Sequence, residues 1–85
     1  MVKLYIDVII QVDKNGKTDP KYIKAGYEGD WIKVKVKERH SMASLQLGMV
    51  GVRYTCGIIY NEIQRDIYLF REESGRWCIE ADDGN

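Results

Sequence analysis

The chain has 85 residues, the length of one domain, and its 13 basic and 13 acidic side chains leave no net charge. Hydrophobic residues make up 45% of the composition and are spread along the chain, which argues against a disordered protein. Neutrality argues against a general nucleic-acid binder, and no apolar run approaches the roughly 20 residues of a membrane span. No secretory signal is visible, so we expect a cytoplasmic protein in which residues 1–85 form one domain and 81–85 a frayed tail.

The opening residues 2–13 carry the clearest periodicity in the sequence. Every second residue from Val2 to Val12 is apolar, which predicts one long strand with a single buried face. Asn15-Gly16 follows, and this dipeptide tolerates the positive φ angles of a tight hairpin turn. A chain reversal is therefore expected at residues 13–17.

Two more strands are predicted before residue 40. Residues 21–25 form a short strand, and Pro20, which has no amide hydrogen, belongs at its start or on an edge. Residues 31–37 alternate, with Ile32, Val34 and Val36 on one face. The opposite face carries Trp31, Lys33, Lys35 and Lys37.

The second half of the chain predicts three further elements after an interruption. Residues 39–47 break the alternation and predict one helical turn or an ordered loop. Residues 52–59 alternate again, residues 61–65 are a connection, and residues 67–70 form the next strand. Residues 76–80 form the last strand, with Trp77 and Ile79 facing inward.

These elements predict an all-β fold. About six short strands, at most one short helical turn and a reversal every ten residues or so favour a small antiparallel curled sheet or an SH3-like or OB-like barrel. Curling encloses one apolar face and removes exposed edges.

No catalytic constellation or metal site is visible. His40 is the single histidine, and neither Ser41 nor Ser44 lies in a nucleophile elbow. His40, Cys56 and Cys78 are too far apart in sequence to form a chelating pair. We therefore expect no enzyme activity, no metal and no cofactor, with both cysteines packed as thiols.

The lysine stripe of residues 31–37 has a functional and a structural explanation. Trp31 beside Lys33, Lys35 and Lys37 is the combination with which small barrels hold single-stranded nucleic acid. Lys21, Lys24 and Arg39 are candidates to extend it. The structural explanation is a solvated face whose lysines protect a strand edge from aggregation.

Aromatic residues outside the main apolar pattern form a second clue. Tyr5, Tyr68 and Phe70 fall on the opposite face of their strands. Tyrosine, tryptophan and arginine concentrate in the hot spots of protein interfaces. The alternative is a second packing layer, which we expect for Phe70.

Three segments resemble a known family. Residues 48–56 (GMVGVRYTC), 67–72 (IYLFRE) and 75–80 (GRWCIE) resemble a family of uncharacterised small proteins of low-GC Gram-positive bacteria and their mobile elements. That family has GxGIRYT, LFxE and GRWFVE motifs, so Cys78 stands where it has phenylalanine. The resemblance implies a compact β domain and a mobile-element origin, and it assigns no site residue.

The leading hypothesis is a non-enzymatic protein-binding inhibitor or modulator of a host nucleic-acid enzyme, specifically an anti-CRISPR protein against a guide-RNA nuclease. Its acidic second half would pair with a basic channel; the residues concerned are Glu72, Glu73, Glu80, Asp82 and Asp83. The alternative is the single-stranded DNA or RNA binder described above. A third hypothesis is a structural subunit that dimerises by pairing strand edges. We expect the protein to be a monomer or a weak homodimer.

Overall fold

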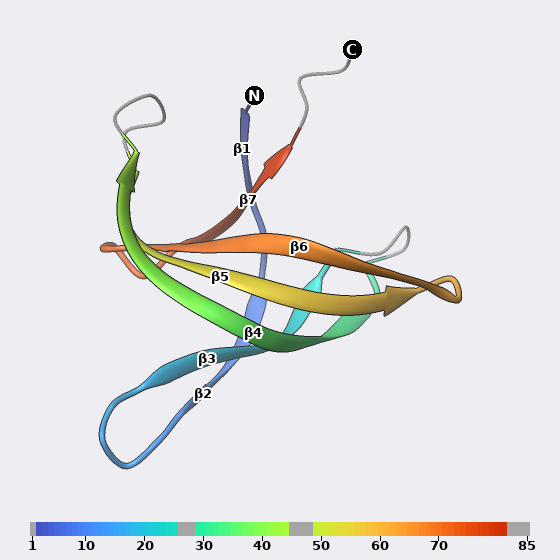
Figure 1. The fold of residues 1–85 in the computed structure, drawn as a ribbon, viewed down its shortest axis with the longest axis horizontal. Coiled ribbons are helices and arrows are strands. Elements are labelled where there is room, and N and C mark those ends of the chain that lie inside the picture. The colour runs from blue at the N-terminus through green and yellow to red at the C-terminus, as the bar shows by residue number, and fades with distance from the viewer. Residues whose placement is uncertain (1, 26–28, 45–48, 82–85) are drawn as a thin grey trace.

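The computed structural model describes residues 2–25, 29–44 and 49–81 and forms one seven-stranded antiparallel sheet (Figure 1). The strands are β1 (Val2–Tyr5), β2 (Val8–Val12), β3 (Thr18–Lys24), β4 (Trp31–Ser44), β5 (Met49–Tyr60), β6 (Ile63–Glu72) and β7 (Trp77–Ala81). Their order across the sheet is β1-β7-β6-β5-β4-β3-β2. The sheet curls, so the predicted all-β class and curled antiparallel sheet are confirmed.

The opening run is two strands, not the predicted one. The amide of Ile6 donates to the carbonyl of Trp77, whereas the carbonyl of Asp7 accepts from the amide of Lys24. The chain therefore crosses at Ile6-Asp7 from the β7 end of the sheet to the β3 end. The predicted buried face is also wrong at Leu4, Ile10 and Val12, which are exposed because edge strands extend beyond the core.

The expected interruption after residue 38 is wrong for residues 39–44, which continue β4. The alternation of apolar and polar residues breaks there because β4 contains a β-bulge. Val36 pairs with Cys56 and Glu38 with Thr55, so Lys37 is the extra residue. An extra residue reverses the inward and outward alternation that follows it. Residues 45–47 of the expected turn lie outside the described part of the chain.

Tight turns join the long hairpins. Asn61 and Glu62 have φ angles of 51° and 64°, which suits the two-residue turn that matches strand twist. Ile63 pairs with Tyr60 directly across it. The connection is therefore the two residues 61 and 62, shorter than the predicted 61–65. Gly16, with a φ of 85°, closes the β2–β3 hairpin that Asn15-Gly16 predicts.

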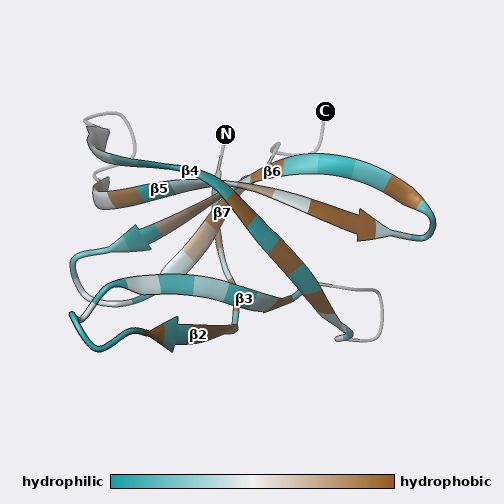
Figure 2. Ribbon diagram, turned by 60° about the horizontal axis from the view of Figure 1, so that its bottom comes forward, coloured by the Kyte–Doolittle hydropathy of each residue, from teal (hydrophilic) through white to brown (hydrophobic). Residues whose placement is uncertain are grey.

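The core fills the inside of the curl. Figure 2 shows apolar and polar residues alternating along β4, and the apolar ones face inward. The rings of Tyr54 and Trp77 lie 5.3 Å apart, and the Tyr54 hydroxyl donates to the carbonyl of Thr18 over 2.8 Å. The buried cluster consists of Ile23, Ile32, Val34, Tyr54, Cys56, Ile58, Leu69 and Trp77. The inward direction of Trp77 is confirmed.

A smaller buried pair lies on the outer face of the sheet. Phe70 and Cys78 are cross-strand partners on β6 and β7, and both are buried. Phe70 was expected to pack in a second layer, and its burial confirms this. Tyr5 and Tyr68 on the same face are exposed.

Candidate functional site

The outer face of β4 carries the predicted lysine stripe. Ile32 and Val34 are buried, whereas Lys33 and Lys35 are exposed and the Trp31 side chain is 46% exposed. Lys37 projects from the bulge and is exposed as well. The structure therefore brings all four predicted residues of the stripe onto one face.

Strand β3 widens this stripe into a surface. Tyr22 pairs with Lys33 and Lys24 with Trp31, so each aromatic ring has a lysine as its cross-strand neighbour. Tyr22 is 39% exposed, and the Lys24 Nζ lies 6.0 Å from the centroid of the Trp31 ring. Lys21 lines a hollow together with Lys33 and Lys35. We call this surface the lysine–aromatic face: Lys21, Tyr22, Lys24, Trp31, Lys33, Lys35 and Lys37.

A hollow of about 360 Å³ lies beside the lysines, and Lys33, Lys35, Lys37, Gly57, Ile59 and Gln64 contribute to its walls. Gly57 is opposite Lys35 on β4 and Asp66 on β6. A Cβ at Gly57 would lie 3.2 Å from the Lys37 Cε. The missing side chain therefore leaves room for the Lys37 stem and for the hollow.

Most lysines of this face lack a counter-charge. Lys37 Nζ lies 2.7 Å from Asp66 Oδ1. Among the described residues, Lys21, Lys33 and Lys35 form no ion pair, and Lys24 contacts the Trp31 ring. A chain with zero net charge thus concentrates uncompensated positive charge on one face.

Arg39, a candidate to extend the stripe, lies on the other face. The bulge at Lys37 turns it inward as the cross-strand partner of Tyr54. Its Nε donates to Asp19 Oδ1 over 2.7 Å. Arg39 therefore lies on the inner face of the sheet, and its charge is already paired with Asp19.

Both cysteines are buried thiols, as the sequence predicts. Burial raises the pKa of the Cys56 thiol to about 11, although Arg39 acts in the opposite direction. A thiol with such a pKa is protonated at neutral pH and is a poor nucleophile.

Glu72, one of the five residues of the predicted acidic surface, is held in an internal network. Its Oε1 accepts from the Tyr5 hydroxyl at 2.5 Å and lies 3.4 Å from Lys3 Nζ. Its Oε2 lies 3.4 Å from an Arg76 nitrogen. The Tyr5 hydrogen bond, followed by the charges of Lys3 and Arg76, holds the pKa of Glu72 below its ordinary value. We call Lys3, Tyr5, Glu72 and Arg76 the Glu72 network.

The other predicted acidic residues have no comparable arrangement in the described part of the chain. Glu73 is exposed in the turn after β6. The backbone of Glu80 lies opposite Lys3. Asp82 and Asp83 fall outside the described residues, so the structure shows no acidic surface built from all five.

No metal site is formed by the described histidine, cysteine and acidic residues. His40 is exposed, with its Nε2 3.2 Å from Glu38 Oε2. Within the described ranges no helix is long and apolar enough to cross a membrane.

Sequence reasoning found the stripe but missed Tyr22 and Gly57. Tyr22 precedes the buried Ile23, so its outward direction follows from alternation once the strand is known. The role of Gly57 depends on cross-strand register, which has no local signal in the sequence.

Comparison with known proteins adds no family. No protein-family model, curated protein or solved structure matches this chain. The resemblance to the small mobile-element proteins stays a prediction.

Proposed function

We propose that this protein is a non-enzymatic binding module that holds single-stranded nucleic acid on its lysine–aromatic face. The observation that carries the proposal is the pair of cross-strand contacts Tyr22–Lys33 and Lys24–Trp31. They place two exposed rings among lysines that have no carboxylate partner in the described part of the chain.

The chemistry of the face matches the two parts of a single strand. Lysines attract phosphates and release their counterions, which gives affinity without reading sequence. Exposed rings stack on bases, and this stacking also tolerates any base. Tyr22 and Trp31 are diagonal neighbours, which in an antiparallel sheet places such side chains about 7–8 Å apart. Two bases of one strand can then meet two separate rings.

The first test is fluorescence anisotropy of a labelled single-stranded oligonucleotide over a range of salt concentrations. Four lysines of the face, Lys21, Lys24, Lys33 and Lys35, have no carboxylate partner among the described residues. They predict a log–log slope of about −2.8, since each neutralised phosphate contributes about −0.7. Lys33→Gln with Lys35→Gln is expected to flatten the slope by about 1.4. Lys3→Gln, a change of the same type at a lysine that pairs with Glu72, is the matched control and is expected to leave the slope unchanged.

A blunt duplex of the same sequence completes this experiment. Its bases are stacked inside the helix, so the rings have nothing to bind, and we expect weaker binding than to the single strand. Absence of single-strand binding at low salt would contradict the proposal.

The inhibitor hypothesis stays a prediction with a different test. It needs Glu73, Glu80, Asp82 and Asp83 free for a basic partner, together with Glu72, which already contacts Lys3 and Arg76. Charge reversal of these acids is expected to abolish inhibition of a guide-RNA nuclease under that hypothesis. The same variant is expected to keep oligonucleotide binding under our proposal.

A further inference from the structure

Strand β2 is an uncharged edge of the sheet. Its residues Val8–Val12 pair with β3 on one side, and no described strand pairs with the other side. Ile10 and Val12 are 43% and 57% exposed, and Ile9 is exposed on the opposite face. Natural edge strands usually carry charges or proline that block pairing, and β2 has neither.

The free side of β2 presents backbone groups at alternate residues. Asp7 and Asp13 both bond toward β3, through the Asp7 carbonyl with Lys24 and the Asp13 amide with Lys17. In an antiparallel strand, bonding direction alternates by residue. Ile9 and Gln11 therefore bond toward β3, and the N–H and C=O groups of Val8, Ile10 and Val12 point to the open side.

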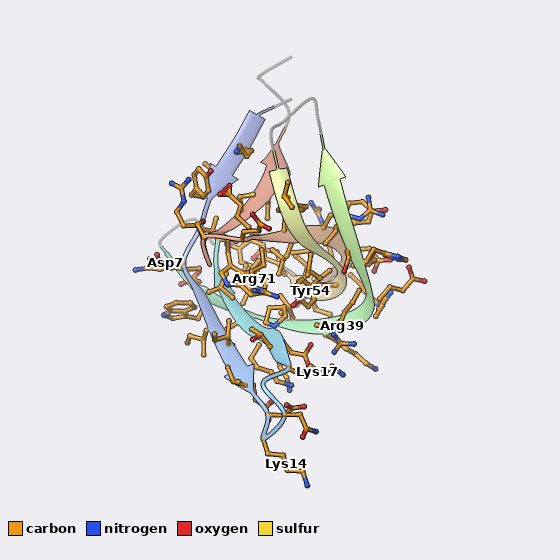
Figure 3. The ribbon with its side chains drawn as sticks, turned by 90° about the vertical axis from the view of Figure 1, so that its left-hand side faces the viewer. Asp7, Lys14, Lys17, Arg39, Tyr54 and Arg71 are labelled. Atoms are coloured by element: carbon orange, nitrogen blue, oxygen red, sulfur yellow. The ribbon has the colours of Figure 1, made fainter. Side chains whose placement is uncertain are left out.

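We propose that β2 pairs with the β2 strand of a second copy, antiparallel, to form a weak homodimer. Antiparallel pairing brings the base of one strand beside the tip of the other hairpin. Asp7 lies at the base, and Lys14 and Lys17 lie at the tip (Figure 3). Asp7 at the base thus faces a tip whose three charged residues, Asp13, Lys14 and Lys17, carry a net positive charge. Apolar Val8–Val12 meets itself between the two ends.

The hairpin tip is suited to this contact because its acidic residue, Asp13, already accepts hydrogen bonds within the turn. The Asp13 carboxylate accepts the amides of Asn15 and Lys17 at 2.8 and 2.9 Å. Lys14 and Lys17 form no ion pair within the described chain. Zero net charge also removes the long-range repulsion between copies that keeps charged proteins apart.

The dimer extends the proposed binding surface, a step that rests on the proposed function. An antiparallel strand pair has its twofold axis perpendicular to the sheet, so the outer faces of both copies lie on the same side. The two lysine–aromatic faces then flank a central β2 pair. One strand of nucleic acid would cross both faces, and binding would become cooperative.

Sedimentation velocity of the protein alone tests the dimer. We expect the mean mass to rise from monomer to dimer across micromolar to millimolar concentration, because a strand-edge interface is small. Ile10→Lys is expected to abolish the rise with an unchanged melting temperature, since Ile10 is exposed. Ile59→Lys adds the same charge at a 68% exposed isoleucine away from β2 and is expected to leave it intact.

A charge swap tests the base-to-tip orientation. Asp7→Lys and Lys14→Asp are each expected to weaken the dimer several-fold, and the double variant to restore it. Failure of the double variant to recover would overturn the antiparallel arrangement. A mass beyond the dimer would overturn the closed pair.

Amide hydrogen exchange locates the interface. The amides of Ile10 and Val12 are expected to be protected only at high concentration, and those of Ile9 and Gln11 at every concentration. Fast exchange of Ile10 and Val12 throughout would overturn the proposal. None of these measurements contains nucleic acid, so loss of the dimer and loss of the proposed function are separate results.

Discussion

Two clusters on the outer surface contain the same kinds of side chain and differ in one group. The lysine–aromatic face has lysines beside Trp31 and Tyr22. The Glu72 network has Lys3 and Arg76 beside Tyr5, with the Arg76 guanidinium carbon 4.2 Å from the ring centroid. Among the described residues, a carboxylate lies at the centre of the second cluster alone, whereas in the first Asp66 pairs only with Lys37. Cations beside an aromatic ring therefore mark a candidate binding surface only where no internal anion already neutralises them.

The largest expected effect is a loss of stability when a side chain is added to the glycine of β5 beneath the Glu72 network. Gly51 lies opposite Glu72, and a Cβ there would be 1.9 Å from the carbonyl oxygen of Arg71. Gly51→Ala is expected to lower the free energy of unfolding by about 3 kcal/mol because a backbone has to move. Urea denaturation measures this change.

Gly57→Ala is the matched control for that comparison. Its Cβ would meet the flexible stem of Lys37 at 3.2 Å instead of a backbone. We expect stability within about 1 kcal/mol of the parent. An equal loss for both variants would show that β5 tolerates neither.

The next effect concerns the rings. Trp31→Ala is expected to weaken single-strand binding by about 1–3 kcal/mol, roughly 5- to 150-fold, because one stacking partner is lost. Tyr5→Ala, in the Glu72 network, is expected to leave affinity unchanged. Anisotropy titrations at one salt concentration measure both. Equal losses would remove the distinction between the clusters.

A smaller effect is expected when Lys37 loses its carboxylate partner. Asp66→Asn removes the carboxylate 2.7 Å from Lys37 Nζ. We expect a few-fold gain in affinity and a salt slope steeper by about 0.7. Stability is expected to change by less than about 1 kcal/mol, because exposed ion pairs contribute little. An unchanged slope would place Lys37 outside the binding surface.

The smallest effect is the acid dependence of the Glu72 network. The pKa of folded Glu72 lies below its ordinary value of 4.5, so below that pH the unfolded chain binds the proton more readily. The stabilisation is complete above pH 4.5 and is lost as the pH falls through the folded pKa. Glu72→Gln is expected to reduce the shift of the urea midpoint between neutral and acid pH. An equal shift in both proteins would contradict this assignment.

The sequence predicted what depends on alternation. The buried Ile32 and Val34, and the outward lysines between them, follow from period two within one strand. The outward side of β6 was predicted in the same way, including the packing of Phe70.

What depends on register or on distant partners was not predictable. The bulge at Lys37 reverses the face of Arg39 without any glycine or proline to mark it. Glu72 reads as a solvated turn residue in the sequence, but Tyr5 and Lys3 reach it from the first strand. The role of Gly57 similarly depends on its cross-strand partners Lys35 and Asp66.

The crossing at Ile6-Asp7 has a consequence for how the chain assembles. β2 pairs with β3 across a short turn, whereas Tyr5 in β1 pairs with Cys78 in β7. Closing so long a loop costs more chain entropy and slows folding. Among the strands of this sheet the ribosome makes β1 before the others, yet its pairing partner β7 follows all of them. The sheet therefore gains its final strand only after every intervening hairpin is available, and until then β7 is an open edge that aggregation can use.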